Sequence, residues 1–80
     1  MTGDFRELDP VVLVRDIPES GLRAGDLGAV VQTYGTAAVE VEFVTARGHT
    51  QALLTLDADA VRPVRDTDLL AVRTAAGSGA

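Results

Sequence analysis

The segment Val39-Glu40-Val41-Glu42-Phe43 decides the fold, because apolar and acidic residues alternate strictly along it. A period of two is typical of a β-strand that buries one face and exposes the other. If residues 46–49 form a hairpin loop, the next strand, Thr50–Leu56, places an apolar residue opposite each inward position. A shift of one residue would bury both glutamates at a cost of several kcal/mol each. The predicted pairs are Thr45–Thr50, Phe43–Ala52, Val41–Leu54 and Val39–Leu56.

On the other side, a three-residue loop at residues 35–37 joins this hairpin to a strand over residues 29–34. The same reasoning on inward positions extends the register across this loop. The result is a three-stranded meander. The predicted pairs are Thr33–Val39, Val31–Val41 and Ala29–Phe43, which leave Val30 on the outward face.

Shorter elements flank the meander. Val11–Val14 and Val61–Val64 are predicted strands, and residues 57–60 suit a single 3₁₀ turn capped by Asp57. The turn-rich residues 16–28 form a loop whose Ile17 and Leu22 plug one end of the structure. This order of elements, in which closure also protects strand edges, is that of an SH3-like barrel.

We therefore expect an all-β fold, a small SH3-like five-stranded barrel with a short C-terminal helix or tail. Residues 1–8 form an N-terminal extension, residues 9–65 the barrel, and residues 66–80 the helix or flexible tail. Within the tail, residues 66–73 begin acidic and end basic, a pattern that favours two helical turns laid on the barrel.

Composition limits the function. Eighty residues form one small domain, and a net charge of −5 argues against a surface that collects nucleic-acid phosphates. The chain has no cysteine, which excludes disulfides and thiolate metal sites. It has no apolar run long enough to span a membrane and no apolar leader at its start. We expect a soluble, cytoplasmic protein that binds no membrane.

Catalytic and metal-binding groups are sparse. The single histidine, His49, falls in a hairpin loop without a carboxylate at ligand spacing, and Asp57 and Asp59 lack the third ligand of a calcium loop. Neither Ser20 nor Ser78 has a histidine near it in the sequence. We predict no catalytic residue, no metal site and no cofactor, and hence not an enzyme.

The turn Gly25-Asp26-Leu27-Gly28 looks like a KOW element, in which a turn bounded by glycines leads into a barrel strand. KOW domains that bind RNA usually carry basic residues at this turn, whereas Asp26 is acidic. The likeness supports the barrel, and an RNA-binding domain remains a third, weaker hypothesis. The sequence also gives no support for a groove that binds proline-rich peptides, because residues 16–28 contain no aromatic residue.

What remains is the outward face of the meander. It combines apolar or amphipathic side chains with two glutamates, which fits a contact surface for a basic protein partner. Scattered apolar residues on a sheet surface also occur without function, and that interpretation stays open. The candidate partner-binding residues are Val30, Tyr34, Glu40, Glu42, Val44 and Leu53.

Several stretches of the chain also carry a family resemblance: Leu8–Leu13, Asp16-Ile17-Pro18-Glu19, Gly21-Leu22-x-x-Gly25-x-x-Gly28, Glu40–Val44, Thr55-Leu56 and Val61–Val64. They resemble a family of small bacterial proteins labelled only as a domain of unknown function. The resemblance implies a stand-alone SH3-like domain, similar to the barrel of nitrile hydratase β-subunits and their small accessory proteins. It also implies a gene often placed beside that of a toxin-like protein. It supplies no catalytic residue, and the tail after Arg65 departs from it.

Two hypotheses follow. The first is a non-enzymatic protein-binding module that masks or stabilises a partner, as an antitoxin or immunity protein does; the partner is basic and encoded by a neighbouring gene. The second is an accessory or maturation factor for a metalloenzyme of the nitrile hydratase type. Self-association through strand edges beside Pro63 and Val11 is also open.

Overall fold

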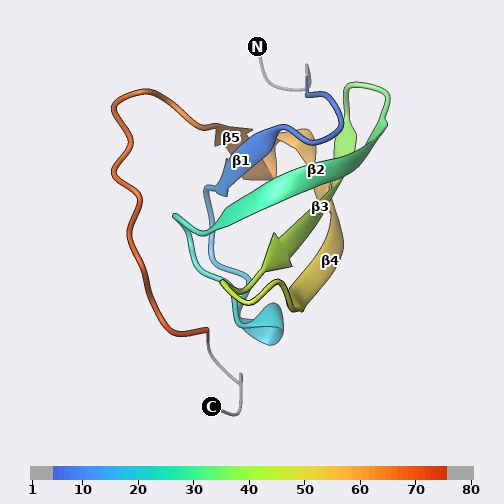
Figure 1. The fold of residues 1–80 in the computed structure, drawn as a ribbon. Helices are drawn as coiled ribbons and strands as arrows, with labels where there is room; N and C mark the ends of the chain where they lie inside the picture. The colour runs from blue at the N-terminus through green and yellow to red at the C-terminus, as the bar shows by residue number, and fades with distance from the viewer. Residues whose placement is uncertain (1–4, 76–80) are drawn as a thin grey trace.

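The computed structural model describes residues 5–75, which form one curved antiparallel sheet of five strands (Figure 1). The only helical elements among these residues are two short 3₁₀ turns, η1 and η2. The all-β prediction is confirmed. In chain order the elements are β1 (Pro10–Leu13), η1 (Pro18–Ser20), β2 (Leu27–Tyr34), β3 (Ala38–Val44), β4 (Thr50–Asp57), η2 (Ala58–Ala60) and β5 (Val61–Pro63).

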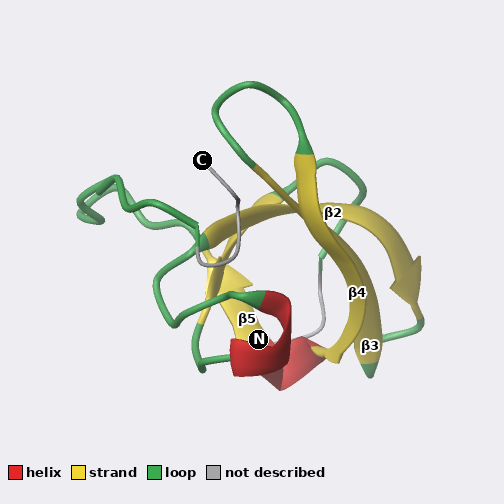
Figure 2. Ribbon diagram, turned by 90° about the horizontal axis from the view of Figure 1, so that it is seen from below, coloured by secondary structure: helices red, strands yellow, loops and turns green. Residues whose placement is uncertain are grey.

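The strand order is β4-β3-β2-β1-β5. The last strand, β5, therefore pairs with the first strand, β1, and not with its neighbour in sequence, β4. Seen from below, the strands curl around a common centre, as in a small barrel (Figure 2). β1 is paired on both sides, with Val11 opposite Gly28 in β2 and Pro63 in β5. The expectation of a free edge beside Val11 is therefore wrong, and the two edges of the sheet are β4 and β5.

The register between β3 and β4 follows the prediction over most of its length. Val39, Val41 and Phe43 pair with Leu56, Leu54 and Ala52, and Glu42 lies opposite Leu53. At the loop end the register shifts by one, so that Val44 rather than Thr45 lies opposite Thr50. The predicted pair Thr45–Thr50 is wrong because a bulge takes up one residue there.

The register between β2 and β3 agrees with the prediction only near the hairpin. Thr33 pairs with Val39, but a bulge between Val30 and Gln32 makes Val30, not Val31, the partner of Val41. A bulge reverses which residues of a strand face inward. Ala29 consequently lies opposite Glu42 instead of Phe43. Val30, predicted to face outward, is fully buried with 0% of its surface exposed.

Aliphatic residues and Phe43 build the core. Its largest fully buried side chains are Phe43, Leu13, Val11, Val30, Val39, Val41 and Val61. Ile17 and Leu22 are also buried and form an isolated β-bridge, which confirms that the loop plugs the structure. Gly28 makes room for Phe43, because a Cβ at residue 28 would lie 2.9 Å from Phe43 Cε1 and 2.6 Å from Val41 Cγ1.

Two local predictions fail. Asp57 stands at the start of η2, but its side chain makes no capping hydrogen bond. Residues 66–75 contain no helix; after a turn at residues 66–67 they follow an extended path along the outside of the sheet (Figure 1). We call residues 65–75 the C-terminal strap. The predicted flexible end of the tail, residues 76–80, lies outside the described residues.

No helix among residues 5–75 has the length and apolar character needed to cross a membrane.

Candidate protein-binding surface

The outward residues of β3 and its neighbours form the face that the sequence indicates. Glu40 pairs with Gln32 of β2 and with Thr55 of β4, while Glu42 lies opposite Leu53. Inward neighbours Val39, Val41 and Phe43 are buried, whereas both glutamates are half-buried. Strand alternation thus places Glu40 and Glu42 on the solvent side, as predicted.

Two large side chains stand exposed on this face. Leu53 is 53% exposed beside Glu42, and Tyr34 is 44% exposed at the end of β2. The carboxylate of Glu42 accepts a hydrogen bond from Thr50 Oγ1 at 2.6 Å, which orients it along β4. Neither glutamate forms an ion pair within the described residues. We define Tyr34, Glu40, Glu42 and Leu53 as the outer face.

The other two candidates lie elsewhere. Val30 belongs to the core, because the bulge turns it inward opposite Val41, so it cannot contact a partner. Val44 is exposed, but it lines a groove between the sheet and the C-terminal strap, together with Leu27 of β2. The structure therefore keeps four of the six candidates on one face and assigns Val44 to a second surface.

The strap is fastened at its beginning by Arg62 and Asp68. The guanidinium of Arg62 donates two hydrogen bonds to the carboxylate, from Nη1 to Oδ2 and from Nη2 to Oδ1, both at 2.9 Å. Asp68 Oδ2 also accepts the backbone N–H of Arg65 at 2.7 Å. The hydrogen bonds from Arg62 and from the Arg65 N–H lower the pKa of Asp68 from 3.8 to about 2.

A second pair fastens its other end. Arg73 donates to both carboxylate oxygens of Asp26, and its Nη2 also donates to Gly21 O at 2.9 Å. Asp26 accepts the Arg23 N–H as well, at 2.8 Å. Burial acts to raise the pKa of Asp26, but the hydrogen bonds from Arg73 and Arg23 outweigh it, and this pKa is lowered.

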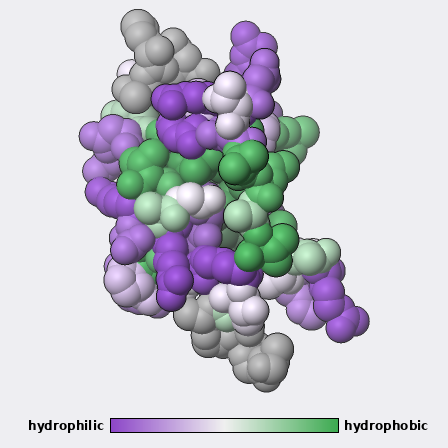
Figure 3. Space-filling view, turned by 90° about the vertical axis from the view of Figure 1, so that its left-hand side faces the viewer, coloured by the Kyte–Doolittle hydropathy of each residue, from purple (hydrophilic) through white to green (hydrophobic). Residues whose placement is uncertain are grey.

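Between the two fastenings the strap exposes apolar side chains. Leu69 is 94% exposed, and Leu70 and Val72 are also far out of the core. The face of the molecule that carries the strap shows a band of apolar surface framed by polar residues (Figure 3). Sequence reasoning placed these leucines on a helix packed against the barrel, and it gave no signal for the two Arg–Asp pairs that hold them in an extended strap.

Catalytic and metal-binding arrangements do not stand out in the part of the chain that is described. No three residues of the types His, Cys, Asp or Glu gather there as metal ligands would. His49 lies exposed in the β3–β4 loop, where its backbone N–H donates a hydrogen bond to Thr45 Oγ1 at 3.3 Å.

A comparison with protein-family models matches residues 7–63 to the Domain of unknown function DUF4926. The match covers most of the chain, from the turn before β1 to the end of β5. The chain belongs to the DUF4926 family. No curated protein and no solved structure matches it. The outer face lies inside the DUF4926 region, and the C-terminal strap follows it.

Proposed function

We propose that this DUF4926 protein is a non-enzymatic protein-binding module that masks or stabilises a basic partner. One observation carries the proposal: Leu53 and Tyr34 stand exposed on a sheet face where the charged residues of β3 and β4 are all acidic. These residues are Glu40, Glu42 and Asp57. An apolar contact with a charged frame is a common arrangement at protein interfaces. The charge of this frame selects a cationic counterpart.

The charge of the whole chain supports the same choice. A net charge of −5 attracts a basic partner at long range and repels nucleic acid. An acidic sheet face of this kind can cover a basic, nucleic-acid-handling site of the partner by imitating the negative charge of the nucleic acid. On this proposal the protein acts as an antitoxin or immunity protein does, which agrees with the gene neighbourhood that the family resemblance implies.

An affinity capture with a matched control tests the proposal. The tagged protein, the double variant Tyr34→Ser/Leu53→Ser and the control Val14→Ser are each incubated with lysate of the source cells. Val14 is 44% exposed, like Tyr34, but it follows β1 and lies outside the outer face. We expect one stoichiometric, basic protein with the wild type and with Val14→Ser, and its loss with the double variant. Equal capture by all three would contradict the proposal.

A further inference from the structure

The two edges of the sheet differ in how they are protected. β5 is three residues long and contains Arg62 and Pro63, two features that discourage a further strand. β4 spans eight residues, and its stretch Thr50–Leu56 contains no charged residue, proline or glycine. Long edges without such protection are the ones that accept an additional strand.

The hydrogen-bond pattern identifies which backbone groups of β4 point to the free edge. Ala58 N donates to Ala37 O at 2.9 Å, one pair beyond Ala38–Asp57. Bonded and non-bonded pairs alternate in an antiparallel ladder. Leu56, Leu54 and Ala52 therefore bond to β3, and the N–H and C=O groups of Leu53 and Thr55 point away from it. Within the described residues, neither Leu53 nor Thr55 makes a backbone bond on that side.

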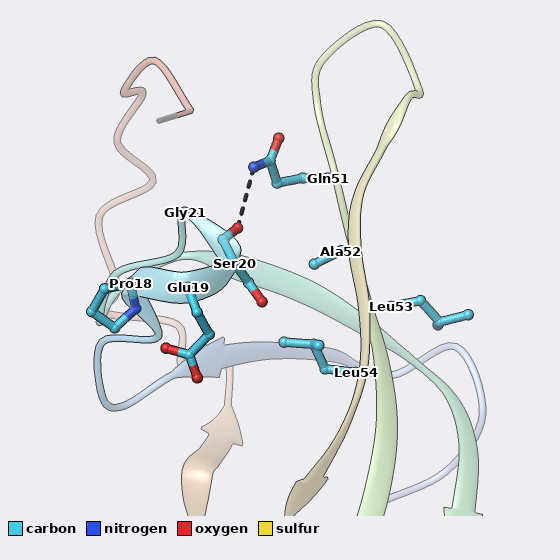
Figure 4. A pocket seen from close by; sticks show the side chains of 8 residues that line it. All are labelled: Pro18, Glu19, Ser20, Gly21, Gln51, Ala52, Leu53 and Leu54. Atoms are coloured by element: carbon cyan, nitrogen blue, oxygen red, sulfur yellow. Dashed lines mark hydrogen bonds between the residues drawn. The ribbon is translucent and has the colours of Figure 1, made fainter. Parts of the chain in front are cut away.

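Beside this edge lies a slot. η1 and its cap Gly21 form one wall, and residues 51–54 of β4 form the other. Gln51 Nε2 donates to Ser20 O at 3.2 Å and closes one end (Figure 4). The side chains of Ala52 and Leu54 point toward the slot, whereas Leu53 points away from it (Figure 4). Because η1 faces this edge, a single extended segment can enter the slot, whereas a second copy of the whole barrel would meet η1.

The charges around the slot define the occupant. Glu19 lies in its wall and forms no ion pair within the described residues, and no basic residue lines it. On the solvent side the acidic groups are Asp57 at the end of β4, and Glu40 and Glu42 in β3, one strand away from the edge. We propose that β4 binds an extended, cationic segment of a partner protein as a sixth strand. Its apolar side chains pack on Ala52 and Leu54, and its Lys or Arg residues meet the glutamates. This inference rests on the proposed function and names the part of the partner that is bound.

Amide hydrogen exchange measured by NMR tests the inference with the intact protein. The probe is the peptide acetyl-Lys-Val-Lys-Val-Lys-Val-Lys-amide, and the control is the same peptide with Glu in place of Lys. Without peptide, the amides of Leu53 and Thr55 exchange quickly while those of Leu54 and Leu56 are protected. At a peptide concentration of about ten times Kd, we expect the exchange of Leu53 and Thr55 to slow about tenfold. The acidic peptide should leave both unchanged.

Two variants test the charge. Glu19→Gln should weaken binding of the Lys–Val peptide several-fold at low salt, and the control Glu7→Gln, in the turn before β1, should leave it unchanged. Unchanged exchange of Leu53 and Thr55 with saturating peptide would overturn the inference. So would protection that grows with protein concentration alone, because a second copy would then occupy the edge. These outcomes are read from backbone amides of the unaltered outer face. Substitution of the Tyr34 and Leu53 side chains tests the proposed function separately.

Discussion

Arg73 and Asp26, 47 positions apart in the chain, are joined by two parallel hydrogen bonds, from Nε to Oδ1 at 2.9 Å and from Nη2 to Oδ2 at 2.5 Å. A planar guanidinium on a carboxylate fixes orientation as well as distance. The pair brings the strap to the turn that precedes β2. With Arg62–Asp68 it explains how a segment whose apolar residues face solvent keeps a defined path.

Loss of this pair should loosen the strap and spare the sheet. In Arg73→Gln we expect thermolysin to cleave within residues 69–72 several-fold faster than in the wild type, because local opening becomes easier. The free energy of unfolding should change little, since the pair is partly exposed. Arg47→Gln, in the exposed β3–β4 loop, is the control. Equal cleavage rates in all three proteins would show that Arg73 does not hold the strap.

The Arg62–Asp68 pair predicts a pH dependence. The pKa of Asp68 is lowered from 3.8 to about 2, so its charged form is the one that the folded protein favours. The stabilisation is present above the ordinary pKa and is lost as the pH falls through the lowered value. The difference in unfolding free energy between wild type and Asp68→Asn should hold at pH 7 and shrink between about pH 4 and pH 2.

Urea denaturation at a series of pH values measures this difference. The control is Asp66→Asn, because Asp66 lies two residues away and forms no ion pair within the described part of the chain. A difference for Asp68→Asn that stays constant down to pH 2 would contradict the assignment.

Gly28 should tolerate no side chain. In Gly28→Ala the new Cβ would lie within 3 Å of Val41 Cγ1 and Phe43 Cε1, both in the fully packed core. Such overpacking costs about 1–3 kcal/mol of unfolding free energy. Shortening the neighbour should recover part of the loss, so the double variant Gly28→Ala/Phe43→Leu is expected to show a favourable coupling energy in a double-mutant cycle. Additive effects of the two substitutions would mean that residue 28 does not touch Phe43.

Leu8 offers a route to higher stability. Its φ of 73° makes it the one non-glycine residue with positive φ in the described chain, and its side chain is exposed. It occupies a turn in which Asp9 N donates to Arg6 O at 3.1 Å, at the position where glycine or asparagine is preferred. Leu8→Asn should raise the unfolding free energy by about 1 kcal/mol. Glu7→Asn, in the same turn, should not. A less stable Leu8→Asn would disprove this explanation.

The sheet follows from the sequence wherever the alternation of side chains is strict. The β3–β4 register was predictable because sliding the strands by one would bury Glu40 and Glu42. β2 carries no such constraint near residues 29–31, where Ala29, Val30 and Val31 are all apolar and fit either face. The bulge there comes from packing: Val30 fills the core opposite Val41, and Gly28 accommodates Phe43.

The C-terminal strap shows the other limit of sequence reasoning. Acidic and basic ends favoured a helix for residues 66–73, but a two-turn helix is only marginally stable without tertiary contacts. The fold instead uses Asp68 to bind Arg62 and Arg73 to bind Asp26. The second of these contacts spans most of the chain, and no local pattern reports it. Of the candidate site, the alternation of β3 predicted Glu40 and Glu42, while the bulge removed Val30.

The central claim is that the outer face binds a basic protein. Its most direct test is calorimetric titration of the captured partner into the wild type and into Tyr34→Ser/Leu53→Ser, after circular dichroism has shown that the variant keeps its sheet. The account predicts a Kd at least about a hundredfold weaker for the variant, because exposed aromatic and aliphatic anchors carry most of the energy of an interface. A Kd within twofold of the wild type would contradict it.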